Sequence, residues 1–125
     1  MSAIPTNFPE TINEGSTARY EAALFDETGA AIPASLITAL TLTMVQAATG
    51  AIINGRNVQN VLNANQVTVD AAGMLRYDLQ PADTAMLDPT QGAEFHRATF
   101  RCTFGVTGQA NWDVDFRIRN LAQVP

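Results

Sequence analysis

The sequence predicts an all-β fold built from two packed antiparallel sheets, and two observations carry that prediction. Two segments near the C-terminus, residues 97–106 and 111–119, alternate apolar and polar side chains along their length. Such alternation gives a strand one buried face and one solvated face, as in sheets that pack against each other. Short segments rich in β-branched residues, separated by glycine and proline turns, recur through most of the remaining chain.

The first sixteen residues differ from the rest, because they hold two prolines and no sustained apolar period. We expect residues 1–16 to form an extended arm outside the core and residues 17–125 to form the sandwich. The arm is open to two interpretations, a frayed terminus or a contact segment. Its apolar side chains Ile4, Phe8 and Ile12 would let it lie in a groove of a neighbouring subunit.

About seven strands are expected after the arm. They are placed at residues 18–25, 35–45, 51–53, 66–70, 75–79, 97–106 and 111–119. Strands of this number and spacing predict an Ig-like antiparallel β-sandwich. In the second of them Leu36, Leu40, Leu42 and Met44 are expected to share one face, and a helical turn is expected after Pro81.

The last two strands form the most regular hairpin, and the parity of their apolar positions restricts its register. An odd-length loop is required, because an even one would place Cys102 opposite Asp113. A three-residue loop of residues 107–109 would pair Phe104 with Trp112 and Phe100 with Phe116. It would also set Arg101 opposite Asp115, and bring Arg97 near Arg119, where Glu94 is expected to relieve the repulsion.

No catalytic, cofactor-binding or metal site is expected. The single histidine, His96, has no nucleophile motif beside it and is interpreted as a polar residue at a sheet end. Cys102 lies among inward phenylalanines, where a thiol behaves as a small hydrophobe. Asp113 and Asp115 share a face and could form a carboxylate pair or a Ca²⁺ site, but ion pairs with Arg101 and Arg117 are the favoured use.

Asparagines recur at every third residue between Ile53 and Gln66. They are Asn54, Asn57, Asn60 and Asn63, followed by Asn65. None begins an Asn-x-Ser/Thr triplet, so none is a glycan acceptor, and a period of three matches neither strand nor helix. Consecutive turns fit, because asparagine bonds its own backbone and tolerates positive φ. We expect an ordered loop in which Val58, Val61 and Leu62 press on the domain or on an adjacent subunit; a partner- or sugar-binding loop is the alternative.

Composition restricts the partners. The chain of 125 residues has 7 basic and 12 acidic residues and a net charge of −5, which argues against a nucleic-acid partner. All basic residues are arginine, which fits either a GC-rich genome or a need for planar guanidinium groups. Without a signal peptide, a long apolar run or a cysteine pair, we expect no membrane association and folding in a cytoplasm.

Three stretches resemble a family of small tailed-bacteriophage proteins and the Ig-like domain at the N-terminus of phage baseplate upper proteins. They are "FDETGAAI", then "ITALTLTMVQAATGAIINGRNVQNVLNANQVTVDAAGMLRYDLQPADTAMLD", and "EFHRATFRCTF" with "WDVDFRIRN". The resemblance covers about residues 18–120. In addition, "LQPADTA" at residues 79–85 is similar to the segment between strands E and F of antibody light-chain variable domains, and this similarity implies an arginine partner for Asp83.

The phage resemblance implies a non-enzymatic virion structural protein assembled in the host cytoplasm. A capsid decoration or cement protein on the head is the first expectation, and a neck or baseplate module is the next. The implied partners are other virion proteins, among them major capsid, neck or tail proteins, together with further copies of the chain. A carbohydrate-binding sandwich and an enzyme are the competing classes; an inward Trp112 argues against the first.

Overall fold

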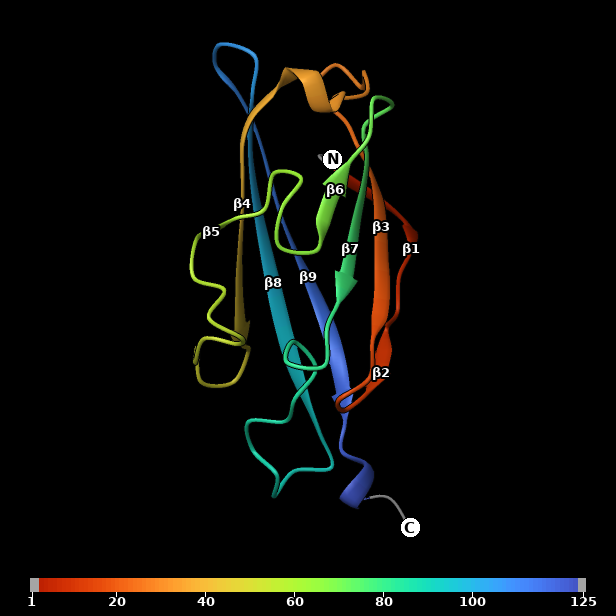
Figure 1. The fold of residues 1–125 in the computed structure, drawn as a ribbon, viewed down its shortest axis with the longest axis vertical. Helices are drawn as coiled ribbons and strands as arrows, with labels where there is room; N and C mark the ends of the chain where they lie inside the picture. The colour runs from red at the N-terminus through yellow and green to blue at the C-terminus, as the bar shows by residue number, and fades with distance from the viewer. Residues whose placement is uncertain (1–2, 124–125) are drawn as a thin grey trace.

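A computed structural model describes residues 3–123, which form two β-sheets packed face to face (Figure 1). The four-stranded sheet has the order β1-β3-β7-β6, and the five-stranded sheet has the order β2-β9-β8-β4-β5. The strands are β1 Ala3–Asn7, β2 Thr11–Asn13, β3 Ala18–Leu24, β4 Ile37–Gln46, β5 Gln59–Asn60, β6 Val67–Val69, β7 Met74–Leu79, β8 Ala93–Phe104 and β9 Gly108–Arg119. Two 3₁₀ turns complete the secondary structure, η1 Ala34–Leu36 and η2 Leu121–Gln123.

The predicted Ig-like sandwich is confirmed by this strand order. In an Ig fold the strands A, B, E and D form one sheet and C, F and G form the other. Here β1, β3, β7 and β6 occupy the A, B, E and D positions, while β4, β8 and β9 occupy C, F and G. The "LQPADTA" segment accordingly lies between the E and F strands, β7 and β8.

The core lies between the two sheets and is built from the alternate residues of each strand. The aromatic rings of Tyr20, Tyr77, Phe100 and Phe116 are fully buried there. The ring centroids of Phe100 and Tyr20, which belong to different sheets, lie 6.2 Å apart. Cys102 is buried among them, and burial raises the pKa of its thiol to about 11. The interpretation of this thiol as a small hydrophobe is consistent with that position.

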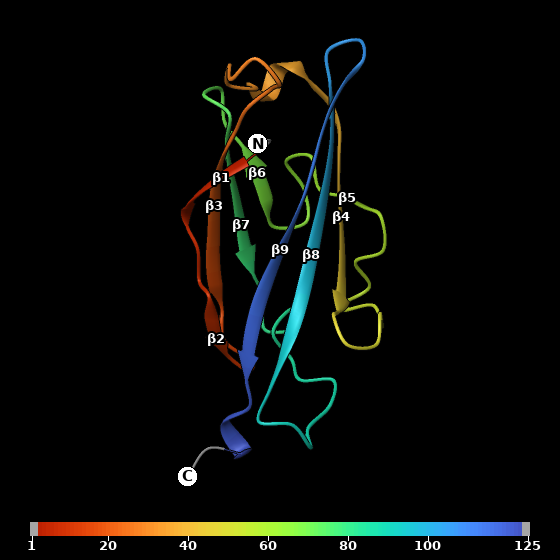
Figure 2. The ribbon, with the colours of Figure 1, turned by 180° about the vertical axis from the view of Figure 1, so that it is seen from behind.

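The first sixteen residues are not a free arm. β1 pairs antiparallel with β3, and the chain then crosses to the other sheet, where β2 pairs in parallel with the end of β9 (Figure 2). The separation into an arm and a sandwich at residue 16 is therefore wrong for the described residues. Prolines made this segment look irregular, but an edge strand tolerates proline because its outer N–H needs no partner.

The hairpin of β8 and β9 has the predicted odd-length loop but a different register. Its loop is residues 105–107, so Phe104 faces Gly108, Phe100 faces Trp112 and Arg97 faces Asp115. The Phe104 ring fills the space that a side chain at position 108 would need, since a Cβ there would lie 2.4 Å from it. The predicted pairs of Phe104 with Trp112 and of Arg101 with Asp115 are therefore wrong, and Val106 is 98% exposed at the loop tip.

Two smaller expectations also changed. Leu36 is exposed and Ile37 is buried instead, because the pairing of β4 with β8 shifts between Ile37 and Ala39. The segment after Pro81 forms hydrogen-bonded turns, with the Asp83 N–H donating to the Gln80 carbonyl at 2.8 Å, and not a helix.

Candidate interaction groove

A fully buried ion pair between Arg56 and Asp83 joins the asparagine loop, residues 53–66, to the turn that follows β7. Arg56 donates from Nε to Asp83 Oδ1 at 2.6 Å and from Nη2 to Oδ2 at 3.1 Å. Asp83 also accepts hydrogen bonds from the Asn54 amide at 2.9 Å and from the Gln80 N–H at 2.8 Å. The arginine partner that the antibody-like segment implied for Asp83 is confirmed.

Arg56 uses all of its N–H groups. Its other three bonds go to Gln59 Oε1 at 2.7 Å, to the Asn65 carbonyl at 3.2 Å and to Gln66 Oε1 at 3.0 Å. Guanidinium offers five donors, and five bonds are made. Burial disfavours the charged forms, but the mutual bonds outweigh it: the pKa of Asp83 lies below its ordinary value and that of Arg56 above it. This cluster ties the asparagine loop to the turn that follows β7.

His96 lies beside the same cluster and is fully buried. Its Nδ1 donates to the Asp83 carbonyl at 2.8 Å, and its Nε2 bonds the Glu94 carboxylate. Burial favours the neutral form of Glu94, but hydrogen bonds from the Leu87 N–H, from His96 and from the Asp88 N–H lower its pKa. His96 is the fourth residue of β8 rather than a residue before it, and Glu94 does not serve an arginine pair as expected.

The asparagine loop has the predicted turn geometry. Asn60 and Asn63 accept hydrogen bonds from the N–H groups of Leu62 and Val69, and Asn65 donates to the Asn60 carbonyl at 2.8 Å. Five residues of the loop other than glycine have positive φ: Asn54, Val58, Asn63, Asn65 and Gln66. Asparagine tolerates this conformation, whereas the β-branched Val58, at φ 50°, is strained in it.

The six expected partner contacts divide into two groups. Ile4, Phe8 and Val58 are 47%, 42% and 64% exposed, and Leu62 is partly buried against the core, so these four stay candidates. Ile12 and Val61 are buried in the core of this same chain. Ile12 is therefore not a partner contact, because β2 packs inward. Val61 presses on the domain itself, which is one of the two positions expected for it.

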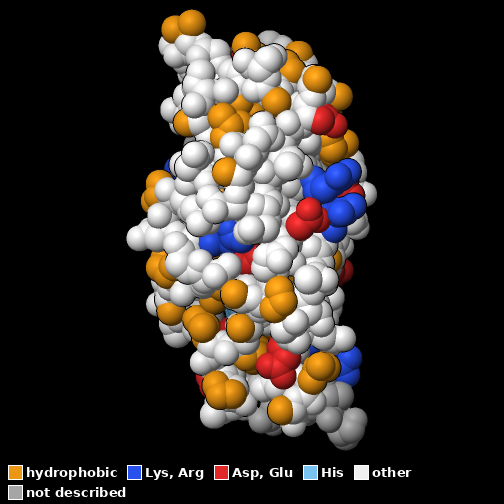
Figure 3. All heavy atoms as spheres, in the orientation of Figure 1, with side chains coloured by type: hydrophobic (Ala, Val, Ile, Leu, Met, Phe, Trp, Pro, Cys, Tyr) orange, Lys and Arg blue, Asp and Glu red, His pale blue; other side chains and the backbone are white. Residues whose placement is uncertain are grey.

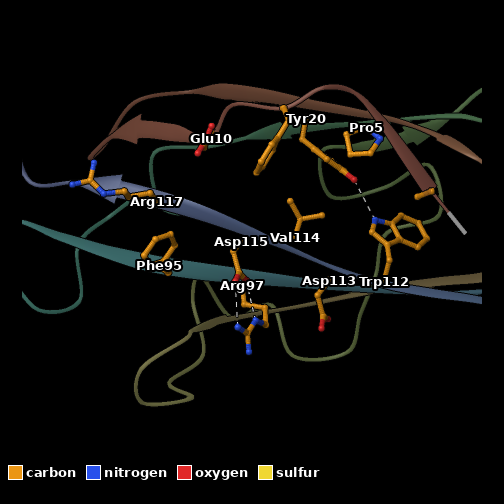
Figure 4. A pocket seen from close by; sticks show the side chains of 12 residues that line it. Pro5, Glu10, Tyr20, Phe95, Arg97, Trp112, Asp113, Val114, Asp115 and Arg117 are labelled. Carbon is orange, nitrogen blue, oxygen red and sulfur yellow. Dashed lines mark hydrogen bonds and ion pairs between the residues drawn. The ribbon is translucent and has the colours of Figure 1, made fainter. Parts of the chain in front are cut away.

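A groove of about 820 Å³ opens along β9, where the chain crosses from β1 to β2 (Figure 4). Its apolar lining includes Pro5, Phe8, Tyr20, Trp112 and Val114. The Trp112 ring stacks on the Phe100 ring, with their centroids 5.1 Å apart, and the Trp112 Nε1–H donates to the Tyr20 hydroxyl at 3.3 Å. The predicted inward orientation of Trp112 holds in part, since the side chain packs on the core yet lines the groove.

Charged side chains border this groove. Asp115 forms a two-bond ion pair with Arg97, at 2.8 and 3.2 Å, and Asp113 accepts from the Thr99 hydroxyl at 2.6 Å. Figure 4 shows both aspartates pointing away from Tyr20, whereas Val114 points toward it. The expected solvated ion-pair face is present, but Arg97, and not Arg101 or Arg117, holds Asp115.

The opposite side of the molecule carries a different surface. On the four-stranded sheet, Arg19 pairs with Asp78 at 2.9 Å and Arg76 with Glu21 at 3.5 Å. Figure 3 shows basic and acidic spheres together at the right, and hydrophobic spheres scattered in small groups over the rest of that face. The groove along β9 is therefore the better candidate for a built interaction site.

Comparisons with known proteins identify no relative: no protein-family model matches the chain, and no curated protein is similar to it. Within residues 3–123, no helix is long and apolar enough to cross a membrane. The same residues hold no group of three or more His, Cys, Asp or Glu side chains placed to bind a metal ion.

The groove was missed in the sequence because its apolar residues come from three segments that are far apart in the chain. Pro5 and Phe8 come from the presumed arm, Tyr20 from β3, and Trp112 and Val114 from β9. Only the crossing of the N-terminal segment between sheets brings them together. The two prolines near Phe8 were the available signal, since proline marks edge strands.

Proposed function

We propose that this chain is a non-enzymatic structural module of a bacteriophage particle that binds other virion proteins through the groove along β9. A capsid decoration or cement role on the head is the form we favour, with assembly in the host cytoplasm and several copies in the particle. The groove is the observation that carries this proposal: an apolar floor beside the open edge of an Ig-like sandwich suits protein recognition. The sequence resemblance to phage sandwiches supplies the virion context.

A binding experiment on particles tests this function. Purified chain is added to phage particles produced without it, the particles are sedimented, and the bound chain is located by immunogold electron microscopy. Label over the head in many copies is expected. Label at the neck or baseplate would replace decoration with those positions, and absence from every fraction of particles would contradict the virion role.

A pair of matched variants tests the groove. Pro5→Arg places a long charged side chain at the groove wall, where no backbone N–H is lost, and is expected to lower the amount bound. Val106→Arg makes a comparable change at the exposed tip of the β8–β9 loop and is expected to bind like the natural chain. Equal binding by the two variants would show that the groove is not the surface through which the chain binds the particle.

A carbohydrate-binding sandwich is the second candidate, and Trp112 in the groove is the observation that favours it. Aromatic faces are common platforms for sugar rings, but one face of this indole already stacks on Phe100 and its N–H is already bonded. A glycan array probed with the isolated chain distinguishes the two. Strong binding to a defined glycan, lost on Pro5→Arg, would favour this second function.

A further inference from the structure

The four outer edges of the two sheets differ in how they are closed. β1 carries Pro5 and a shift in pairing between Pro5 and Asn7, and β6 is only three residues long. The edge of β4 is covered by the asparagine loop. β9 has twelve residues, of which β2 pairs only with Arg117 to Arg119. Long open edges are what natural sandwiches normally avoid.

The backbone groups that this edge leaves open can be assigned by parity. The Arg117 N–H donates outward to the Glu10 carbonyl at 3.0 Å, and the Arg119 carbonyl accepts outward from the Glu14 N–H at 2.9 Å. Backbone groups alternate in direction along a strand, and the register with β8 is unbroken from Gly108 to Arg119. Residues 109, 111, 113 and 115 therefore point their N–H and C=O groups outward, and within residues 3–123 no strand pairs with them.

The groove lies directly beside these groups. Trp112 and Val114 alternate with the outward-directed residues and form part of its floor, while Pro5 and Phe8 form the far wall. A strand added along β9 would continue the line of β2. Its alternate side chains would enter the groove, where apolar residues fit best, and the remaining ones would lie beside Asp113 and Asp115.

Charge selects what those remaining side chains should be. Asp115 is neutralised by Arg97, but Asp113 has no ion-pair partner among residues 3–123, and Glu10 at the rim has none either. A second copy of this chain would bring the same aspartates to the edge, and like charges across a strand pair are destabilising. The net charge of −5 acts in the same direction. A basic strand would therefore be attracted to this edge, whereas a second copy of the chain would be repelled.

We propose that residues Gln109–Asp115 of β9 accept an extended segment of another protein, in which apolar residues alternate with arginine or lysine, as an added strand. This inference rests on the proposed assembly role of the groove and names its partner by chemistry. The apolar residues of the segment fill the groove, and its basic residues lie over Asp113. Its backbone completes the open edge of the five-stranded sheet.

Synthetic peptides long enough to span Gln109–Asp115 test this directly. One alternates valine and arginine, a second alternates valine and glutamate, and a third has the composition of the first with all valines before all arginines. Trp112 is the only tryptophan, so its fluorescence reports occupancy of the groove. Binding is expected for the first peptide alone, and it should weaken as salt is added. Equal binding of the glutamate peptide would overturn the proposal.

Amide hydrogen exchange adds a pattern that unspecific binding cannot imitate. On binding of the valine and arginine peptide, exchange should slow at Asn111, Asp113 and Asp115. Ala110 and Val114 donate toward β8 and should be protected with or without the peptide. No change at the three outward amides would show that the peptide does not add as a strand.

Asn111→Pro removes one outward donor without breaking a bond to β8, because proline fits an extended backbone at an edge. Affinity for the valine and arginine peptide should fall about tenfold, against little change for Asn111→Ala. Asp113→Asn is a second variant that keeps the backbone intact, and it should lower both the affinity and its salt dependence. Equal affinity of all three variants with the natural chain would contradict strand addition.

The outcomes separate this inference from the proposed function. If the peptide binds as described but particles do not take up the chain, the virion role fails and strand addition stands. If particles take up Asn111→Pro as readily as Asn111→Ala, the virion role stands and strand addition fails. If light scattering shows a dimer of the natural chain that Asn111→Pro abolishes, the occupant is a second copy and the basic segment is wrong.

Discussion

β4 and β9 are the long strands nearest to the two outer edges of the five-stranded sheet, and they are similar in length. The outer side of β4 is closed, whereas that of β9 is largely open. Along β4, the backbone groups of Leu40, Met44 and Gln46 bond residues of the loop at 51–61, at distances of 2.8 to 2.9 Å. β9 pairs with β8 along its whole length, but on its outer side only its last three residues pair with a further strand, β2. The closed edge is held by the Arg56–Asp83 pair, and the open one is bordered by solvated charges.

The difference shows how a sandwich protects an edge without a further long strand. β5 has only two residues, so the loop around it covers β4 through turns with positive φ and through a buried ion pair. Such a cover is effective but depends on a few side chains. On β9 the equivalent protection is limited to Asp113 and Asp115, because charge discourages accidental pairing. The predictions below act on one edge and use the other as reference.

The largest effect is expected from Arg56→Met. Removing one partner of a buried ion pair leaves Asp83 uncompensated, which typically costs about 3–5 kcal/mol. The free energy of unfolding, measured in urea, should fall by that amount. Amide exchange should accelerate at Met44 and Gln46, whose N–H groups donate to the loop, and not at Ala110 on β9. Equal acceleration on both strands would mean that the pair stabilises the whole domain rather than the β4 edge.

Acid should remove the stabilisation that Asp83 gives to the closed edge. In the folded state, burial raises the pKa of Asp83, but the bonds from Arg56, Gln80 and Asn54 outweigh it, so this pKa lies below its ordinary value. The resulting stabilisation is fully present above the pKa of an unfolded aspartate, about 3.9, and is lost as the pH falls through the lower pKa of the folded state. Unfolding free energy should therefore fall below about pH 4. Asp83→Asn should be less stable at neutral pH and show a shallower acid slope. An unchanged slope would assign the titration to other groups, Glu94 first.

Gly108→Ala tests the register that leaves the β9 edge open at Gln109. An added Cβ would lie 2.4 Å from the Phe104 ring, and overpacking of this kind costs about 1–3 kcal/mol. Gly92→Ala is the control, because a Cβ there meets nothing within 4 Å. Thermal unfolding of the two variants checks this. If Gly108→Ala is as stable as Gly92→Ala, Phe104 does not face position 108.

Val58→Asn should stabilise the protein by about 1 kcal/mol, because asparagine adopts positive φ more readily than a β-branched residue. The matched change Val106→Asn, at an exposed valine of the β8–β9 loop, should leave the stability unchanged. Both are measured by urea unfolding. If Val58→Asn gains stability but loses uptake into particles, the strained valine is also a partner contact, as predicted for it.

The smallest effect is expected from Arg97→Met on the open edge. The Arg97–Asp115 pair is exposed, and exposed pairs contribute little to stability. The urea midpoint should stay within experimental scatter of the natural chain, in contrast to Arg56→Met. A loss as large as that of Arg56→Met would remove the distinction between the two edges.

Most of the architecture could be predicted because it depends on local alternation. The alternating residues of β3, β7, β8 and β9 bury the faces that the sequence indicated, and the odd hairpin loop followed from parity. The register within that parity could not be predicted, since shifting the pairing by two residues on each strand keeps the same side chains inward. Packing of Phe104 over Gly108 decided between the two registers.

The candidate site was predictable only in fragments. Asp113, Asp115 and Trp112 were singled out in the sequence. Of their neighbours, Pro5 and Phe8 were assigned to an arm, and Tyr20 to a strand far away along the chain. Ile12 was assigned to the same arm and is a core residue. Nothing local distinguishes an arm from two short edge strands, because such strands gain their stability from the sheets that they join.

Local chemistry, therefore, established the all-β class, the inward faces of the long strands and the turns of the asparagine loop. Each of these depends on residues close in sequence, through the period of two or through side-chain bonds to nearby backbone. Tertiary structure alone decided that the N-terminal segment joins both sheets, that Arg56 meets Asp83, and that β9 keeps an open edge beside a groove. These features need segments far apart in the chain to meet, and no local pattern carries that information.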